Sequence, residues 1–411
     1  MTNYEQLLDA AASLGQHLLD SGGEIHRVED SVQRLLRAYG VEGEVFAIPN
    51  CLIVSFTGPD GHVYTRMLRA RVQGVNIEGI ERYNALSRHL CADPPADTGL
   101  LLSQVRDAPP LRSWSMGIQL LGYAIGGFSF TLFFSGGALD ALVGGLAGLA
   151  AGLTALALGR RSRSNFFVNT MAAGFMLAVV VYAALLAGLD INAQVVISGS
   201  IMTLVPGLVF TNFMSDLLTG DIVAGLSTFA RAVLSAGAIA LGTGTAITLA
   251  RSLLTLPAGS TAVVRWSPPL CCLFAALGCL GFCFPYNVWG KGMVLSCLGG
   301  AVGWGVYLAA QALGGNVYVC NLAASLVVSV YAEIMARVRK CPATSYLVIS
   351  FFPLVPGLII YQAMDYSIQG NTQLFLETFI RTFGIAGCIA LGSLLVSTTL
   401  RLAQKRRSTR T

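Results

Sequence analysis

Charged residues are scarce in this sequence. Asp, Glu, Lys and Arg make up 11% of the 411 residues, hydrophobic residues make up 54%, and the mean hydropathy is +0.66. Soluble domains carry about 25% charged residues. The composition therefore excludes an ordinary soluble protein and indicates a membrane protein.

The few charges are also unevenly distributed. All four histidines and 14 of the 21 acidic residues precede Leu111, so the long remainder of the chain holds only seven acids. We therefore expect a soluble head of about 110 residues, a common size for one domain, followed by a membrane body. The N-terminus is acidic and amphipathic rather than basic and then apolar, so no signal peptide is expected.

Several chemical motifs are missing. The sequence has no Walker A motif and no nucleophile with a recognisable partnering base, so we expect neither ATP-driven function nor enzymatic activity. The ten cysteines form no CxxC pair. Cys279 and Cys283 share a helix face but would need two further ligands to hold a metal, and packing as small apolar residues is the favoured interpretation. We expect no cofactor and no metal.

The head is predicted to be a small α+β domain. The expected elements are helices over 4–19, 21–40 and 77–90, and strand-like runs over 44–57 and 62–72. Ser21 and Glu24 fit a capping box at the start of the second helix, and Gly40 fits its end. The two strand-like runs flank a Gly-Pro-Asp-Gly turn and predict a hairpin, and a proline-rich linker follows the last helix.

A dense polar cluster opens the second helix. It consists of Glu24, His26, Arg27, Glu29 and Asp30. One histidine with helical carboxylates is less than a recognisable metal or hydrolytic site. The favoured interpretation is a solvated helix start with acids near the positive helix end, and the alternative is a cytoplasmic gating or docking surface.

Ten hydrophobic spans follow, each long enough to cross about 30 Å of hydrocarbon. They cover 114–134, 138–159, 166–187, 191–213, 222–249, 266–285, 292–313, 317–336, 342–364 and 374–400. With the head in the cytoplasm, the inside loops and the tail hold twelve basic residues, against Arg251 and Arg265 outside. Because basic residues mark cytoplasmic loops, both termini are expected inside.

The pentapeptide LVPGL occurs twice, at 204–208 and at 354–358. The offset of 150 continues from Ser200/Ser350 to Gly242/Gly392, with 18 identities in 43 positions. Each copy lies in the fourth span of a five-span unit. Because five is odd, the second unit must enter the membrane from the opposite side, which predicts two inverted five-helix repeats. The predicted domains are 1–111, 112–251 and 252–411.

Both pentapeptides contain a helix break. Pro206 with Gly207, and Pro356 with Gly357, remove or loosen helix hydrogen bonds and free carbonyl groups that lipid cannot satisfy. These groups must face protein or a water-filled cavity. We therefore predict the substrate path where the two broken helices meet, with a purely structural kink as the alternative.

Two arginines are matched inside the predicted spans. Arg231 lies nine residues past Ile222, about 14 Å deep at 1.5 Å per residue, where a charge costs at least ~2.5 kcal/mol and needs an interior partner. Arg381 has Glu377 one turn before it, a favourable spacing for an ion pair. Arg231 is thus the predicted contact for an anionic substrate group, and Glu377 with Arg381 a proton-responsive pair. Snorkelling or a structural role is the alternative.

Five further polar residues complete the predicted site. Asn212 and Gln362 lie six residues after each proline, and Asn321 has a polar counterpart in the third span. All three are candidate substrate contacts. Asp216 and Asp365 lie near opposite mouths of the predicted path and are candidates for proton coupling, although a solvated loop or interface position is the favoured interpretation.

Three parts of the sequence carry a family resemblance, namely SGGEIHRVEDSVQRLLRAYG, YTRMLRARVQGVNIEGIERYNALSRHL and the paired LVPG spans. In these parts the chain resembles the threonine/serine exporter family, and the similarity covers essentially the whole chain. Members have a cytoplasmic N-terminal domain and ten spans, and the resemblance implies proton-driven efflux of threonine and serine. The family also includes two-protein versions that divide near residue 250, one of them linked to succinate export. A dicarboxylate is therefore the alternative substrate.

We therefore expect a secondary active exporter in the plasma membrane that works by alternating access, with a passive channel as the alternative. The expected partners are a small amino acid or carboxylate substrate, protons and the lipid bilayer, with no nucleic acid. A homo-oligomer is left open.

Overall fold

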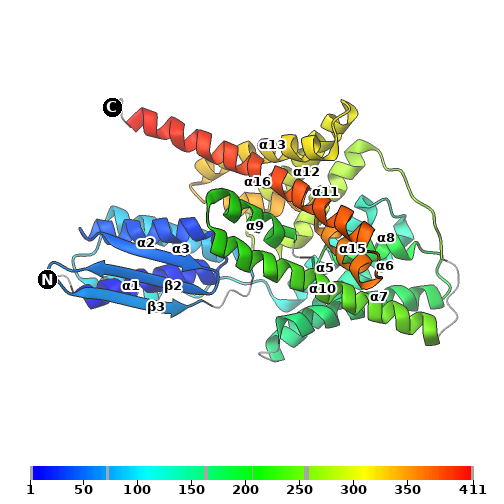
Figure 1. The fold of residues 1–411 in the computed structure, drawn as a ribbon, viewed down its shortest axis with the longest axis horizontal. Helices are drawn as coiled ribbons and strands as arrows, with labels where there is room; N and C mark the ends of the chain where they lie inside the picture. Colours follow the sequence, from blue (N-terminus) through cyan, green and yellow to red (C-terminus); the bar gives the residue numbers. More distant parts are fainter. Residues whose placement is uncertain (1–2, 71–73, 162–164, 206, 254–258, 409–411) are drawn as a thin grey trace. The chain divides into compact units, whose positions relative to one another are not determined.

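The computed structural model describes residues 3–70, 74–161, 165–205, 207–253 and 259–408 (Figure 1). The chain divides into two compact units, and each is described by itself. The N-terminal unit comprises residues 1–113 and two short later segments, 286–289 and 339–345. The membrane unit, as we call the second one, comprises the rest of the chain.

The N-terminal unit is an α+β fold. Its elements are α1 (Tyr4–Asp20), α2 (Ile25–Ala38), β1 (Gly43–Ile48), β2 (Cys51–Thr57), β3 (Val63–Arg69), α3 (Ile77–Ala92) and α4 (Thr98–Arg106). The strands form an antiparallel sheet in the order β1-β2-β3. Leu52, Val54 and Phe56 of β2 are buried, and the residues between them are partly exposed. This alternation places one sheet face against the core formed with α1 and α2.

The sequence prediction of this unit needs two additions. The run 44–57 is not one strand, because Pro49 and Asn50 form a turn and Ile48 pairs with Cys51 across it. The 62–72 run supplies β3, so the sheet has three strands rather than two. The residues placed in a linker also contain the helix α4, whose first turn is capped by the Asp97 carboxylate at 2.9 Å from the Gly99 nitrogen.

The predicted capping box at Ser21 is wrong. Ser21 ends α1 instead, and its hydroxyl donates to the carbonyl of His17 at 2.7 Å. The amides of Gly22 and Gly23 donate to Leu19 and Leu18, which is a Schellman motif, and Gly22 has a φ of +79°. Two successive glycines therefore favour a helix end at the position where the sequence pattern indicated a helix start.

The membrane unit is entirely helical in its described part. Its helices are α5 (Met116–Phe133), α6 (Ala138–Arg161), α7 (Phe166–Leu186), α8 (Ala193–Ile201), α9 (Gly207–Thr219), α10 (Ile222–Leu253), α11 (Pro268–Cys283), α12 (Lys291–Ala312), α13 (Val317–Arg339), α14 (Thr344–Ser350), α15 (Gly357–Ile368) and α16 (Thr372–Ser408).

Within the described residues, seven helices are long and apolar enough to cross a membrane. They are α5, α6, α7, α10, α12, α13 and α16. The predicted span 266–285 contains α11, a shorter apolar helix, and the spans 191–213 and 342–364 are each broken into two helices. The chain is thus a multi-pass membrane protein, while ten spans in two inverted repeats remain a prediction.

Glycines allow close helix crossings in this unit. A Cβ atom at Gly148 of α6 would lie 2.5 Å from the carbonyl oxygen of Tyr123 in α5. A Cβ atom at Gly281 of α11 would lie 2.6 Å from the backbone nitrogen of Gly126, also in α5. Both positions exclude any side chain, so α5 packs tightly against α6 and α11.

Candidate functional site

The two helix breaks have the same internal geometry. After α8, the amides of Leu204 and Val205 both donate to the carbonyl of Ile201. After α14, the amides of Leu354 and Val355 donate in the same way to Phe351. The next helices, α9 and α15, then start 150 residues apart. Pro206 lies outside the described residues.

Pro356 and Gly357 form the start of α15. Pro356 is buried and is the N-cap residue, and no side chain caps the helix there. The amide of Gly357 donates to the carbonyl of Val355 at 2.7 Å. The first turn of α15 therefore begins in the protein interior, and no side chain of the described residues caps its amides.

The two breaks meet. A Cβ atom at Gly357 would lie 2.8 Å from Val205 Cγ1 and 3.4 Å from Met202 Sδ, so the second break directly contacts the first. The neighbouring helices pack reciprocally, because α10 contacts α15 and α16 contacts α9. The two broken helices are therefore in contact, while a substrate path between them stays a prediction.

Matched serines connect each break to its own half. Ser200 at the end of α8 donates to the Gly144 carbonyl of α6 at 3.0 Å. Ser350 at the end of α14 donates to the Ser296 carbonyl of α12, also at 3.0 Å. Both serines are fully buried. The equivalent contacts in the two halves are thus made by equivalent residues.

Phenylalanines fill the junction between α9, α10 and α16. The matched residues Phe229 and Phe379 have ring centroids 6.4 Å apart, and Phe213 and Phe383 pack against them. These side chains belong to one apolar core that also includes Tyr361 of α15. The face of α10 that meets the second half is therefore largely apolar.

Arg231 points elsewhere. Its Cζ atom lies 5.5 Å from the centroid of the Phe166 ring, a cation–π distance, and the side chain is half-buried. Phe166 is the first residue of α7. Because α10 has 32 residues and so extends about 48 Å, it is longer than the hydrocarbon layer requires. Ile222 therefore need not mark the membrane surface, and the depth of Arg231 stays a prediction.

The expected pair of Glu377 and Arg381 is not formed. Both side chains are exposed on α16. Glu377 Oε1 instead accepts a hydrogen bond from Gln373 Nε2 at 3.0 Å. In the part of the chain that the structure describes, no ion pair joins Glu377 to Arg381. Their spacing permits contact, but solvent around both groups makes it weak.

The other predicted contacts do not converge on one point. Asn212 is exposed on α9 and Gln362 is half-buried on α15. Asn321 is buried, and its amide donates to Val317 of its own helix at 2.7 Å. The Asp216 carboxylate accepts from the Thr228 hydroxyl at 3.5 Å, and the Asp365 carboxylate accepts from the Gln369 amide at 2.6 Å. No hydrogen bond joins any two of these five among the described side chains.

One polar contact between the halves was missed by the sequence analysis. Thr243 Oγ1 of α10 and Tyr361 Oη of α15 lie 3.2 Å apart, and both residues are buried. They are 118 residues apart, so the 150-residue repeat does not pair them. Only the packing of α10 against α15 brings them together.

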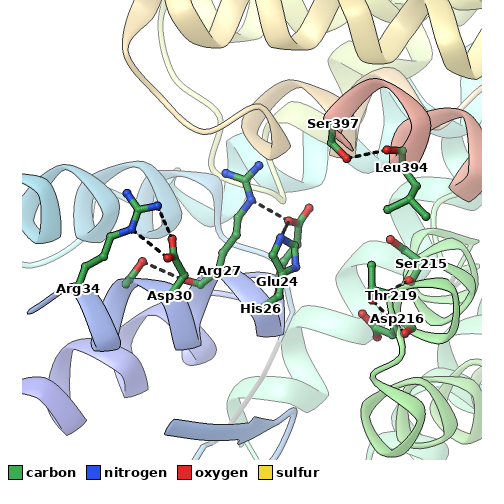
Figure 2. Close-up of polar contacts among 11 residues, drawn as sticks. Glu24, His26, Arg27, Asp30, Arg34, Ser215, Asp216, Thr219, Leu394 and Ser397 are labelled. Carbon is green, nitrogen blue, oxygen red and sulfur yellow. Dashed lines mark hydrogen bonds and ion pairs between the residues drawn. The ribbon is translucent and has the colours of Figure 1, made fainter. Parts of the chain in front are cut away.

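The polar cluster of the head forms local ion pairs (Figure 2). Glu24 Oε2 lies 2.8 Å from Arg27 Nε and 3.6 Å from His26 Nε2, and Asp30 pairs with Arg34 at 2.9 Å. No group of three metal-ligating side chains occurs in the described residues.

In the membrane unit, Figure 2 shows the Thr219 hydroxyl at the end of α9, which donates to the Ser215 and Asp216 carbonyls at 3.0 Å.

Within the N-terminal unit, α3 holds both of the later segments. The amide of Ile77 donates to the carbonyl of Tyr286 at 2.9 Å, and the guanidinium of Arg88 donates to the carbonyl of Lys340. Burial raises the pKa of Glu81, while the Ser345 hydroxyl and the Arg339 charge oppose that rise. Among the described residues the Ser345 hydroxyl has no hydrogen bond of regular geometry, yet it lies close enough to Glu81 to lower the pKa of that carboxyl.

Family models match both halves of the chain. The model described as "Putative threonine/serine exporter" matches residues 9–250, and the one described as "Threonine/Serine exporter, ThrE" matches residues 271–399. This chain belongs to the threonine/serine exporter family. The first match covers most of the N-terminal unit and the first predicted repeat, and the second match covers most of the second predicted repeat.

Curated relatives agree with the family models. A threonine/serine exporter of Corynebacterium glutamicum is 25% identical over 417 residues, covering 96% of this chain and 83% of the relative. A probable threonine/serine exporter of Mycobacterium tuberculosis is 22% identical over 411 residues, covering 95% of this chain and 77% of the relative. No solved structure matches this chain.

A third relative is named for another solute. The probable succinate transporter subunit YjjP of Klebsiella aerogenes is 27% identical over 243 residues, which are 57% of this chain and 90% of the relative. Together, the family and the apolar helices show a membrane transporter of a small solute.

Proposed function

We propose that this protein is a secondary active exporter of threonine and serine that works by alternating access in the plasma membrane. One observation carries the proposal. Two helix breaks with the same internal hydrogen bonds meet at the contact between the two halves of the membrane unit. Broken helices at a repeat interface are the usual setting of a transporter's substrate site.

The open start of α15 supports a substrate with a carboxylate. Its N-cap Pro356 is buried and provides no side-chain hydrogen bond. Helix N-termini carry partial positive charge and unpaired amides, which favour anionic groups. A carboxylate near Gly357 would supply the cap that no side chain of the described residues provides for the first turn of α15.

The loop contacts support inversion of the second half. The loops before α6 and α8 pack against the connection between the halves: Ser135 accepts from Val264 at 2.8 Å, and Asn192 donates to Ala262 at 3.2 Å. The equivalent loops of the second half contain 286–289 and 339–345, which belong to the N-terminal unit. Equivalent loops with different neighbours are what two inverted repeats would produce.

The coupling ion and the orientation belong to the same proposal. Proton antiport would use carboxylates, and Glu377, Asp216 and Asp365 stay the predicted carriers. Arg231 stays the predicted contact for an anionic group. The charge bias of the loops favours cytoplasmic termini.

A dicarboxylate such as succinate is the second candidate substrate. It is favoured by the similarity to a relative named as a succinate transporter subunit. That relative corresponds to only 57% of this chain, whereas the two relatives named for threonine and serine cover nearly all of it. Threonine and serine are therefore the first candidate substrates.

The experiment uses vesicles that contain the purified full-length protein. Uptake of labelled threonine, serine and succinate is measured with and without a proton gradient, and with unlabelled substrate inside to detect counterflow. The proposal predicts threonine or serine counterflow and faster uptake with a gradient. Ion conductance without counterflow would indicate a channel, and exchange of succinate alone would indicate a dicarboxylate exporter.

A further inference from the structure

The junction of α10 and α15 contains a hydroxyl pair inside an apolar core. Thr243 is fully buried and Tyr361 is 7% exposed. Ile239 and Ile360 are among their core neighbours. Buried polar groups are costly unless their hydrogen bonds are made.

The pair leaves one acceptor unused. Thr243 has a single hydroxyl proton, and its oxygen lies 3.0 Å from the Ile239 carbonyl and 3.2 Å from the Ala240 carbonyl of its own helix. Because that proton serves α10, Tyr361 must donate to Thr243 across their 3.2 Å contact. The lone pairs of Tyr361 Oη then have no donor among the described residues.

A second acceptor follows one turn later on α15. Asp365 is four residues after Tyr361, the spacing that places two side chains on one helix face. Its Oδ2 atom accepts from Gln369 at 2.6 Å, and no hydrogen bond to Oδ1 occurs in the described part of the chain. Tyr361 and Asp365 lie on one face of α15, and each therefore has an oxygen that can accept a hydrogen bond from a ligand.

We propose that Tyr361 and Asp365 form the subsite that binds the ammonium group of the transported substrate. This inference rests on the proposed export function and adds residues to it. An ammonium group brings three donors and no acceptor, so it fits an acceptor-only surface. A second carboxylate would be repelled by Asp365 instead. The start of α15, one turn before Tyr361, lies where the substrate carboxylate would be bound.

Thr243 acts as a positioning residue in this subsite. By accepting the Tyr361 proton, it directs the tyrosine lone pairs away from α10 and towards the ligand. Removing the Thr243 hydroxyl would free the tyrosine to turn its proton towards the ammonium group. The threonine should therefore affect substrate affinity without contacting the substrate.

The test measures threonine counterflow in vesicles as a function of substrate concentration. The variants are Asp365→Asn, Tyr361→Phe and Thr243→Val, which keep side-chain size while removing charge or hydroxyl. We expect KM for threonine in counterflow, an exchange that needs no net proton transfer, to rise at least tenfold, about fivefold and about threefold respectively, with the maximal exchange rate changed less than twofold. The matched control is Thr245→Val, an exposed threonine of α10 that bonds only to its own helix, and its KM should be unchanged.

The outcomes separate this inference from the proposed function. Variants that lower the maximal rate or the yield of folded protein with unchanged KM would overturn the subsite, because a purely structural role gives that pattern. Partial recovery of KM in Asp365→Glu would support it. A wild-type protein that exchanges neither threonine nor serine would contradict the proposed function itself.

Discussion

Arg231 and Arg381 occupy equivalent positions in α10 and α16, yet their surroundings differ. Arg231 is half-buried beside the Phe166 ring, whereas Arg381 is exposed. Two residues earlier, Phe229 and Phe379 are alike, since they contact each other in one core. The two halves thus share their apolar contacts and helix breaks, whereas the equivalent arginines have different surroundings. We infer that substrate chemistry depends on where helix packing places polar side chains, and not on the repeat alone.

The largest expected effect separates the two arginines. Arg231→Ala should abolish threonine transport while the protein still inserts and folds, because a half-buried charge is retained for function. Arg381→Ala should keep most of the transport rate, because replacing an exposed side chain removes few contacts. Counterflow rates of both variants, with size-exclusion profiles as the folding control, check this comparison. Normal export by Arg231→Ala would show that the residue is structural.

A smaller effect is expected at the meeting point of the breaks. Gly357→Ala would place a Cβ atom 2.8 Å from Val205 Cγ1, and such overpacking costs about 1–3 kcal/mol. We expect the transport rate to fall about tenfold. The matched control is Gly237→Ala in α10, where a Cβ atom meets nothing within 4 Å. Equal rates in the two variants would mean that the contact between the breaks is not required.

Glu377 tests whether the second half carries proton coupling. Glu377→Gln should flatten the pH profile of transport more than it raises KM, because the amide cannot take up the proton. Gln373 donates a hydrogen bond to Glu377 and can donate the same bond to the amide oxygen of the substituted side chain, so no strain is expected. Transport rates between pH 5 and 8 measure the effect. An unchanged profile would remove Glu377 from the coupling role.

The smallest effect is expected at Glu81 in the N-terminal unit. Burial raises the pKa of its carboxyl, so the folded state favours the protonated form. The associated stability is present at low pH and is lost as pH rises through the raised pKa. Glu81→Gln mimics the protonated form and should unfold at a higher temperature than wild type near pH 8, with little difference near pH 5. Glu44→Gln, at an exposed position of β1, is the control. An equal shift of the unfolding temperature of Glu81→Gln at both pH values would refute this role of Glu81.

The sequence predicts the fold well where the signal is local. Helix periodicity and Gly40 place α2 and its end, and hydropathy places the seven continuous spans. Local rules fail where two signals compete. At Ser21 a capping pattern competes with two glycines that end a helix, and at Pro49 a turn divides an apparently continuous strand.

The candidate site is less predictable than the fold. The repeat predicts that the breaks meet, because equivalent segments approach each other near a symmetry axis. It gives no indication of Thr243 and Tyr361, whose separation is not that of the repeat. It also cannot show that Arg231 turns towards α7, since that direction depends on how the helices pack rather than on sequence spacing.

Inversion of the two halves is tested most directly by mapping the turns after α9 and α15. Thr219→Cys and Gln369→Cys are exposed equivalents at these turns. They are labelled in whole cells with a membrane-impermeant thiol reagent, and the native ten-cysteine protein gives the background. The account predicts labelling of Gln369→Cys from outside, and of Thr219→Cys only after the cells are opened. Labelling of both from the same side would contradict the inverted architecture.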